Sequence, residues 1–166
     1  MKPKKGELFE SYFFEGSNLS IRVEARHQQG FLLFVPGAYY DYEAKSKNSD
    51  VWKPIFTILF DDPVEIPKDQ IKEIKKQVVY MFIGWVYSVT TDGGKTWYTW
   101  NGNPEQAQYT GDMYGFIDEI QIDANGLGVM IIRDRQGDLE ELHTKDFGKT
   151  WEKLQEYNKL SSSTYQ

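Results

Sequence analysis

Apolar and polar residues alternate along much of this chain of 166 residues, which is the pattern of a β-strand with one buried face. Residues 8–14 and 19–25 both alternate in this way, and the four residues between them, E-G-S-N, are typical of a hairpin turn. Turn residues also separate further candidate strands, which cover residues 31–35, 55–60, 78–83, 86–90, 95–100, 116–122, 129–132, 139–143 and 149–154. The pattern therefore predicts an all-β fold of antiparallel strands.

Three segments depart from this alternation. Residues 67–76 favour a helix, because Ile71 and Ile74 are three apart and a proline opens the segment. Residues 39–50 and 101–115 are expected to be loops. Loops of this length in a compact domain usually carry function or are disordered.

A motif of eight residues occurs twice, with its aspartates 54 residues apart (146 − 92). Residues 90–97 and 144–151 both read T-x-D-x-G-K-T-W. Alternating residues lead into a D-x-G turn and a large aromatic leads out, as in a β-hairpin whose tip is fixed by its own side chains. The motif residues predicted to be structural are Thr90, Asp92, Gly94, Thr96 and Trp97, and Thr144, Asp146, Gly148, Thr150 and Trp151.

Both segments resemble the Asp-box, or BNR repeat, of sialidases and other β-propellers. The resemblance implies a turn between the last two strands of a four-stranded, blade-like sheet. It implies that each aspartate accepts hydrogen bonds from its own turn, that each glycine has a positive φ, and that each tryptophan packs inward. The Asp-box of propellers lies away from the catalytic face, so a structural role is implied here as well.

The length limits the architecture. Residues 1–160 are expected to form a single all-β domain, with residues 161–166 as a flexible tail. A complete propeller needs at least four blades of roughly 40–50 residues, and 166 residues are too few for that. We therefore expect antiparallel blade-like sheets, arranged as a partial β-propeller or a twisted sandwich, with two Asp-box hairpins.

Charge and composition restrict the chemistry. The net charge of −6 argues against nucleic acid as a partner, and the chain has no run of 18 apolar residues that would span a membrane. There is no cysteine, and His27 and His143 are the only histidines, so no metal site and no cofactor is expected. A sialidase would need a cluster of arginines, whereas the four arginines here form two separate pairs. The sequence therefore predicts no catalytic residues and a protein that is not an enzyme.

The chain also resembles the immunity proteins that accompany type VI secretion lipase effectors. The resemblance rests on the apolar residues 78–89 leading into the first motif, and on residues 117–130 followed by residues 143–151. It covers about half of the chain and implies a non-catalytic protein that binds and neutralises a cognate secreted antibacterial toxin. Members are usually lipoproteins, and this chain has no lipobox cysteine. A mature periplasmic form is expected, or a cytoplasmic one if Met1 is the native start. A carbohydrate-binding domain and a propeller-type assembly factor are the alternatives.

A partner-binding surface is predicted where alternation lapses and aromatic residues accumulate. Acidic residues among these aromatics, including Asp41, Glu43 and Glu105, would steer a basic partner. The alternative is a solvated loop whose tyrosine rings cover a sheet edge. The residues predicted to bind the partner are Tyr39, Tyr40, Tyr42, Trp52, Tyr109, Asp112 and Tyr114.

Overall fold

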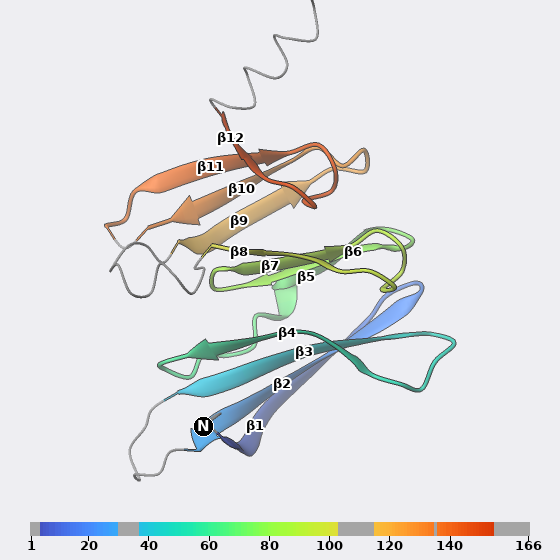
Figure 1. Cartoon of the computed structure of the whole chain (residues 1–166), viewed down its shortest axis with the longest axis vertical. Coiled ribbons are helices and arrows are strands. Elements are labelled where there is room, and N and C mark those ends of the chain that lie inside the picture. Colours follow the sequence, from blue (N-terminus) through green and yellow to red (C-terminus); the bar gives the residue numbers. More distant parts are fainter. Residues whose placement is uncertain (1–3, 30–36, 103–114, 135, 155–166) are drawn as a thin grey trace, which may run out of the picture.

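Strands that follow one another in sequence also lie side by side in this protein. The computed structural model describes residues 4–29, 37–102, 115–134 and 136–154. Within these residues, the first four strands, the next four and the last four each form one antiparallel sheet. The three sheets are stacked (Figure 1). The prediction of an all-β fold with antiparallel, blade-like sheets is confirmed.

The three sheets are built in the same order. The first contains β1 (Lys4–Glu15), β2 (Leu19–Gln29), β3 (Ala38–Ser46) and β4 (Lys53–Phe60). A 3₁₀ turn, η1 (Lys68–Gln70), precedes the second, which contains β5 (Ile71–Lys75), β6 (Val78–Ile83), β7 (Val86–Thr90) and β8 (Tyr98–Asn101). The third contains β9 (Phe116–Ile122), β10 (Gly128–Arg133), β11 (Leu139–Thr144) and β12 (Glu152–Lys153).

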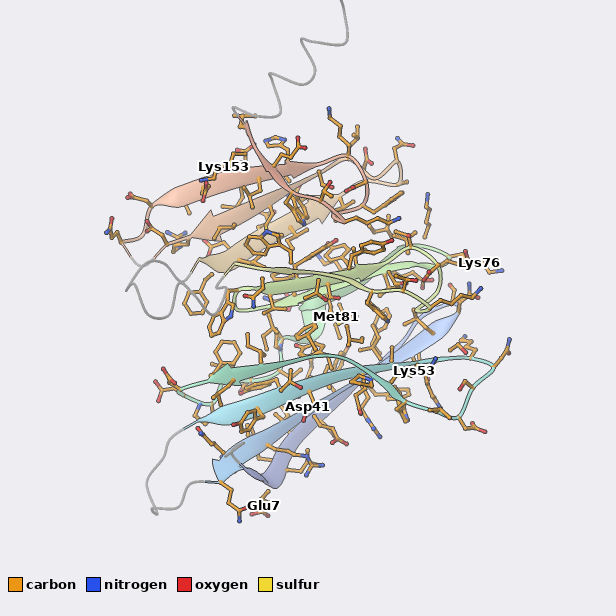
Figure 2. The ribbon with its side chains drawn as sticks, in the orientation of Figure 1. Glu7, Asp41, Lys53, Lys76, Met81 and Lys153 are labelled. Atoms are coloured by element: carbon orange, nitrogen blue, oxygen red, sulfur yellow. The ribbon has the colours of Figure 1, made fainter. Side chains whose placement is uncertain are left out.

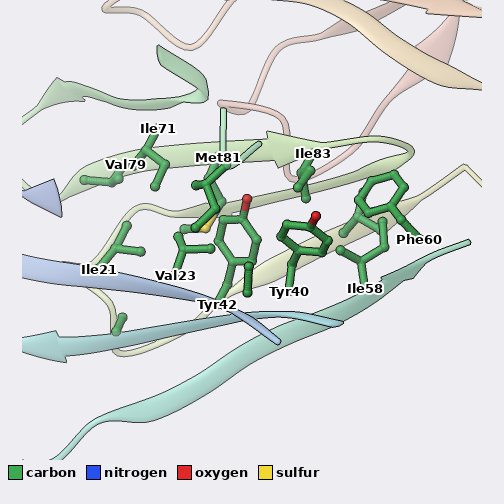
Figure 3. Packing of buried hydrophobic residues seen from close by; sticks show 14 of the residues in the cluster. Ile21, Val23, Tyr40, Tyr42, Ile58, Phe60, Ile71, Val79, Met81 and Ile83 are labelled. Atoms are coloured by element: carbon green, nitrogen blue, oxygen red, sulfur yellow. The ribbon is translucent and has the colours of Figure 1, made fainter. Parts of the chain in front are cut away.

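The second sheet lies between the other two, and this position explains its sequence. All six residues of β6 and all five of β7 are buried. Met81 packs against the first sheet (Figures 2 and 3). Tyr80, its neighbour in the strand, packs against the third sheet. Both faces of the sheet are covered, so burial does not alternate along these strands, and even the polar residues Ser88 and Thr90 of β7 are buried.

The first sheet has one covered face and one open face. On β2, Ile21 and Val23 are fully buried against the second sheet, while Arg22 and Glu24 lie on the opposite face. Such alternation is expected of an antiparallel sheet with one solvated side. The outermost sheets thus close the stack with polar surfaces.

Aromatic side chains connect the three sheets along one edge. The ring of Trp85, in the turn between β6 and β7, lies 5.3 Å from the ring of Phe60 in the first sheet. It lies 5.8 Å from the ring of Phe116 in the third sheet. The backbone adds a direct link, because Ile117 N–H donates to the carbonyl of Gly84 at 2.7 Å.

The predicted helix over residues 67–76 is wrong. The segment contains the short turn η1 and then strand β5. Ile71 packs in the core between the first and second sheets, and Ile74 packs in the core between the second and third. Side chains alternate between the two faces of a strand, so residues three apart point to opposite faces, and this spacing serves both faces of β5 instead of one face of a helix.

Other predicted boundaries also change. Within the expected loop over residues 39–50, residues 39–46 belong to strand β3. The strands that follow the two motifs begin later than expected, at Tyr98 and Glu152. The predicted strand over residues 31–35 and the tail over residues 161–166 lie outside the described residues. No helix in the described part of the chain is long and apolar enough to cross a membrane.

Candidate functional site

The first T-x-D-x-G-K-T-W motif forms the turn between β7 and β8, the last two strands of the second sheet. Asp92 Oδ1 accepts hydrogen bonds from the N–H groups of Lys95 (3.0 Å) and Thr96 (2.9 Å) and from the hydroxyl of Thr90 (2.8 Å). The Thr90 hydroxyl in turn accepts from Gly94 N–H at 2.9 Å. Gly94 has a φ of +88°, a conformation that favours glycine.

The second motif repeats this arrangement between β11 and β12. Asp146 Oδ1 accepts from Thr150 N–H at 3.0 Å and from the Thr144 hydroxyl at 2.8 Å, and Oδ2 accepts from the Thr150 hydroxyl at 2.7 Å. Gly148 N–H donates to the Thr144 hydroxyl at 2.8 Å, and Gly148 has a φ of +83°. The side chains of the motif are therefore used within their own turn.

The tryptophan of each motif also packs against residues of the preceding sheet. Trp97 packs on the core between the first and second sheets, and Trp151 meets the buried ring of Tyr87 edge-on at 5.5 Å. The Tyr87 hydroxyl donates to the carbonyl of Phe147 at 2.7 Å. Through these contacts, the motifs help to hold neighbouring sheets together.

Electrostatics favour the ionised form of both motif aspartates. Burial raises the pKa of Asp92. Hydrogen bonds from Thr96 N–H and the Thr90 hydroxyl lower the pKa by a larger amount, so the net pKa lies below its usual range. The pKa of Asp146 is lowered in the same way, because the hydrogen bonds from Thr150 and Thr144 outweigh burial.

Three of the predicted partner-binding tyrosines are core residues, and their prediction as a binding surface is wrong. Tyr40 and Tyr42 are 0% and 1% exposed, and Tyr39 is 9% exposed. Tyr40 and Tyr42 point toward the second sheet (Figure 3), and burial raises the pKa of both phenols. Tyr40 and Tyr42 occupy positions of β3 that alternation reserves for apolar residues.

Trp52 lies half-buried on the open face of the first sheet, where its ring is already in contact with other side chains. The guanidinium of Arg22 lies 4.6 Å from the ring centroid, the Lys45 ammonium lies 5.1 Å away, and the Phe13 ring packs edge-on at 5.7 Å. The carbohydrate alternative relied on exposed tyrosines and Trp52, so these contacts and the buried tyrosines weaken it. Tyr109, Asp112, Tyr114 and Glu105 lie outside the described residues.

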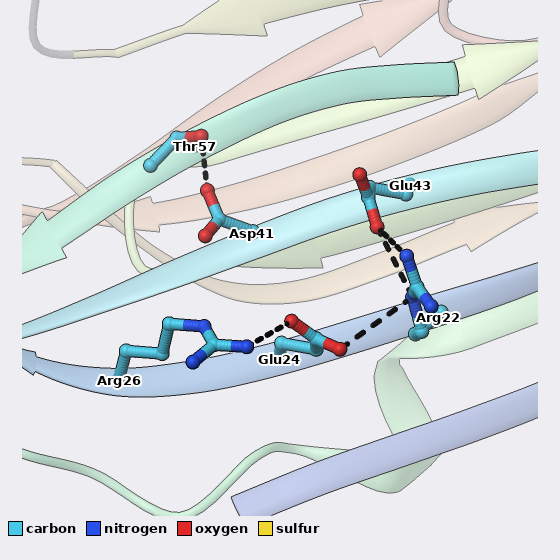
Figure 4. Close-up of polar contacts among 6 residues, drawn as sticks. All are labelled: Arg22, Glu24, Arg26, Asp41, Glu43 and Thr57. Atoms are coloured by element: carbon cyan, nitrogen blue, oxygen red, sulfur yellow. Dashed lines mark hydrogen bonds and ion pairs between the residues drawn. The ribbon is translucent and has the colours of Figure 1, made fainter. Parts of the chain in front are cut away.

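On the open face of the first sheet, Asp41 and Glu43, the acidic residues expected to steer a partner, are bonded to neighbouring side chains (Figure 4). Arg22 donates to the carboxylate of Glu43, and the Thr57 hydroxyl donates to Asp41 Oδ1 at 2.6 Å. Glu24 also pairs with Arg26 at 2.8 Å. The open face therefore consists of charges that largely satisfy one another.

Carboxylates near the two hollows between the second and third sheets hold local structure. Asp123 Oδ1, beside a hollow of about 580 Å³, accepts two N–H groups of its own turn, at 2.8 and 3.0 Å. Asp134 Oδ1, beside a hollow of about 370 Å³, does the same at 2.9 and 2.8 Å. Among the described residues, no three His, Asp or Glu side chains gather in a way that would hold a metal ion.

A surface that the sequence did not indicate lies at the junction of β1 with the connection between the first two sheets. Phe9 is 39% exposed and Val64 is 42% exposed, and both contact the buried residue Tyr40. The Phe9 ring also packs on the imidazole of His27, with centroids 4.5 Å apart. We call Phe9, His27 and Val64, with Tyr40 beneath them, the Phe9 patch.

A β-bulge exposes Phe9. Leu8 pairs with Arg26 and Glu10 pairs with Ala25, so Phe9 is an extra residue on β1 at this point. Bulges at sheet edges re-aim side chains and are frequent beside functional sites. The sequence signal is the adjacency of Leu8 and Phe9, because a regular alternating strand cannot bury both.

No protein-family model, curated protein or solved structure was found to match this chain.

Proposed function

We propose that this chain is a non-catalytic protein-binding module. Its most specific form is an immunity protein that binds a cognate secreted antibacterial toxin, such as a phospholipase effector of a type VI secretion system, and blocks it stoichiometrically in the periplasm. The observation that carries the proposal is the Phe9 patch, where two large apolar side chains stay exposed on a domain with two well-buried cores. Exposed apolar groups rimmed by polar ones are typical of protein contacts.

Rigidity supports the same proposal. The Tyr40 hydroxyl donates to the carbonyl of Val64 and accepts from its N–H at 2.7 Å, so both backbone groups of Val64 are held. Glu10 Oε2 accepts from Ile66 N–H at 3.0 Å and fixes the connection to β1. A surface that is ordered before binding loses little conformational entropy when a partner arrives.

The direct test uses the product of a toxin gene encoded beside this one. Co-expression of the chain, directed to the periplasm of a sensitive strain, should restore growth, and the purified proteins should form a complex of fixed stoichiometry by light scattering. Continued growth arrest, together with no complex between the purified proteins, would overturn the proposed function.

A further inference from the structure

The rim of the Phe9 patch is acidic, and this charge indicates the chemistry of a partner. The connection that carries Val64 also carries Asp61, Asp62 and Glu65, all of them exposed. Glu10 adds a fourth carboxylate, close enough to Tyr40 for its charge to act on the phenol. Asp61, Asp62 and Glu65 thus lie within three residues of Val64 along the chain, and Glu10 directly follows Phe9, so four carboxylates adjoin the two exposed apolar residues in sequence.

We propose that the Phe9 patch docks a basic segment of the partner protein, in which an apolar side chain packs between Phe9 and Val64. Lysine or arginine side chains on either side of that residue pair with Glu10, Glu65 and the two aspartates. This inference rests on the proposed function for the identity of the partner, but the chemistry of the segment follows from the patch alone. Complementary charge of this kind raises association rates and selects the partner.

The backbone of the connection over residues 61–66 is held by hydrogen bonds, so its carboxylates are positioned before a partner binds. Because Tyr40 holds Val64 and Glu10 holds Ile66, residues 61–66 present their carboxylates from an anchored segment. Carboxylates on the open face of the first sheet differ, since Glu24 and Glu43 are neutralised by neighbouring arginines. Within the described part of the chain, no ion pair involves Asp61, Asp62 or Glu65, so the patch provides a negative charge that a partner can neutralise.

A peptide titration tests the chemistry without any knowledge of the partner. The ¹⁵N-labelled chain is titrated with a lysine-rich peptide that contains one leucine–phenylalanine pair, and with a glutamate-rich peptide of the same length and the same pair. The amide signals of Phe9, Val64 and Glu65 should shift with the basic peptide only. Equal shifts with both peptides, shifts confined to other surfaces, or no shifts at all would each overturn the inference.

Variants test the site against a partner that the wild-type chain neutralises. Phe9→Ala with Val64→Ala should weaken binding about 30-fold or more, the size expected for a hot spot worth about 2 kcal/mol. The matched control is Leu127→Ala with Leu139→Ala, which removes two side chains that are 50% and 61% exposed on the third sheet. The control should bind like the wild type.

Charge is tested separately, since the apolar variants also remove packing on Tyr40. Asp61→Asn, Asp62→Asn and Glu65→Gln together should weaken binding about tenfold at low salt and reduce its salt dependence. Asp138→Asn, Glu119→Gln and Glu140→Gln change the net charge equally on the third sheet and should leave both unchanged. Full-strength binding by folded patch variants would overturn the site while the function stands. A wild-type chain that binds no toxin would overturn the proposed function. The peptide titration would then still show whether the Phe9 patch binds a basic segment.

Discussion

Replacing Gly148 by alanine should destabilise the protein far more than the same change at Gly94, although both glycines hold the same place in the motif. At φ values of +83° and +88°, a side chain costs roughly 1–2 kcal/mol at either site. A Cβ at Gly94 would meet the side chain of Leu19 at 3.3 Å, which a small rotation relieves. A Cβ at Gly148 would lie 2.7 Å from Cζ of Tyr87, a ring that is 0% exposed and bonded to the carbonyl of Phe147.

The difference between the two sites has two components. Displacing the ring of Tyr87 breaks its hydrogen bond and leaves buried polar atoms unpaired, which costs about 1–3 kcal/mol. Forcing extra volume into a packed core costs about 1–3 kcal/mol more. The expected loss is therefore roughly 3–8 kcal/mol for Gly148→Ala, against roughly 1–2 kcal/mol for Gly94→Ala.

Urea denaturation followed by circular dichroism measures these losses. Tyr87→Phe removes the hydroxyl that the new methyl group strikes, so the variant that combines it with Gly148→Ala should lose less stability than the sum of the single variants. Equal losses at Gly94 and Gly148, or strict additivity in the double variant, would refute the view that the second motif is locked onto Tyr87.

Four further predictions concern the motif aspartates, two tyrosines and catalysis. Asp92→Ala and Asp146→Ala should each lower the melting temperature, at about 1–3 kcal/mol per variant, while binding persists; an unchanged melting temperature in both would reject their structural role. Because the pKa of both carboxyls is lowered on folding, their stabilisation is present above the unfolded pKa of about 4 and is lost as pH falls through the folded pKa. Acid titration of stability should therefore be flatter in the Asp92→Asn and Asp146→Asn double variant. Tyr39→Phe should leave the melting temperature unchanged or raise it, because its buried hydroxyl has no hydrogen-bond partner among the described residues, whereas Tyr87→Phe should lower it. Assays with sialosides, simple esters and phospholipids should give background rates; turnover abolished by a single substitution would contradict a non-catalytic protein.

The strands could largely be predicted from the sequence, because alternation depends on local chemistry. Strand β3 shows how this reasoning fails. Its residues Tyr40 and Tyr42 point inward and Asp41 and Glu43 outward, so the period of two is present where the accumulation of aromatic residues predicts a binding loop. A tyrosine ring with its hydroxyl bonded to backbone, as Tyr40 is to Val64, behaves as a core residue.

The Phe9 patch could not be predicted from the sequence, because its parts meet only in the folded chain. Phe9 and Val64 are 55 residues apart (64 − 9), and Tyr40 brings them together. The bulge that exposes Phe9 depends on how β1 pairs with β2, which alternation alone does not fix. Trp52, in contrast, lies half-buried on the open face, where its neighbours Arg22 and Lys45 come from β2 and β3.

The central position of the second sheet has a consequence for how the protein is made. During synthesis the first sheet is complete at Phe60, yet the strands that cover its apolar face end only at Thr90, so 30 more residues (90 − 60) must emerge from the ribosome. Until then Ile21, Val23 and Met81 lack their final neighbours. Nascent chains arrested in this interval would expose an apolar surface that can bind chaperones or aggregate. Since the second sheet serves both neighbours, no shortened form of the stack leaves every apolar face covered.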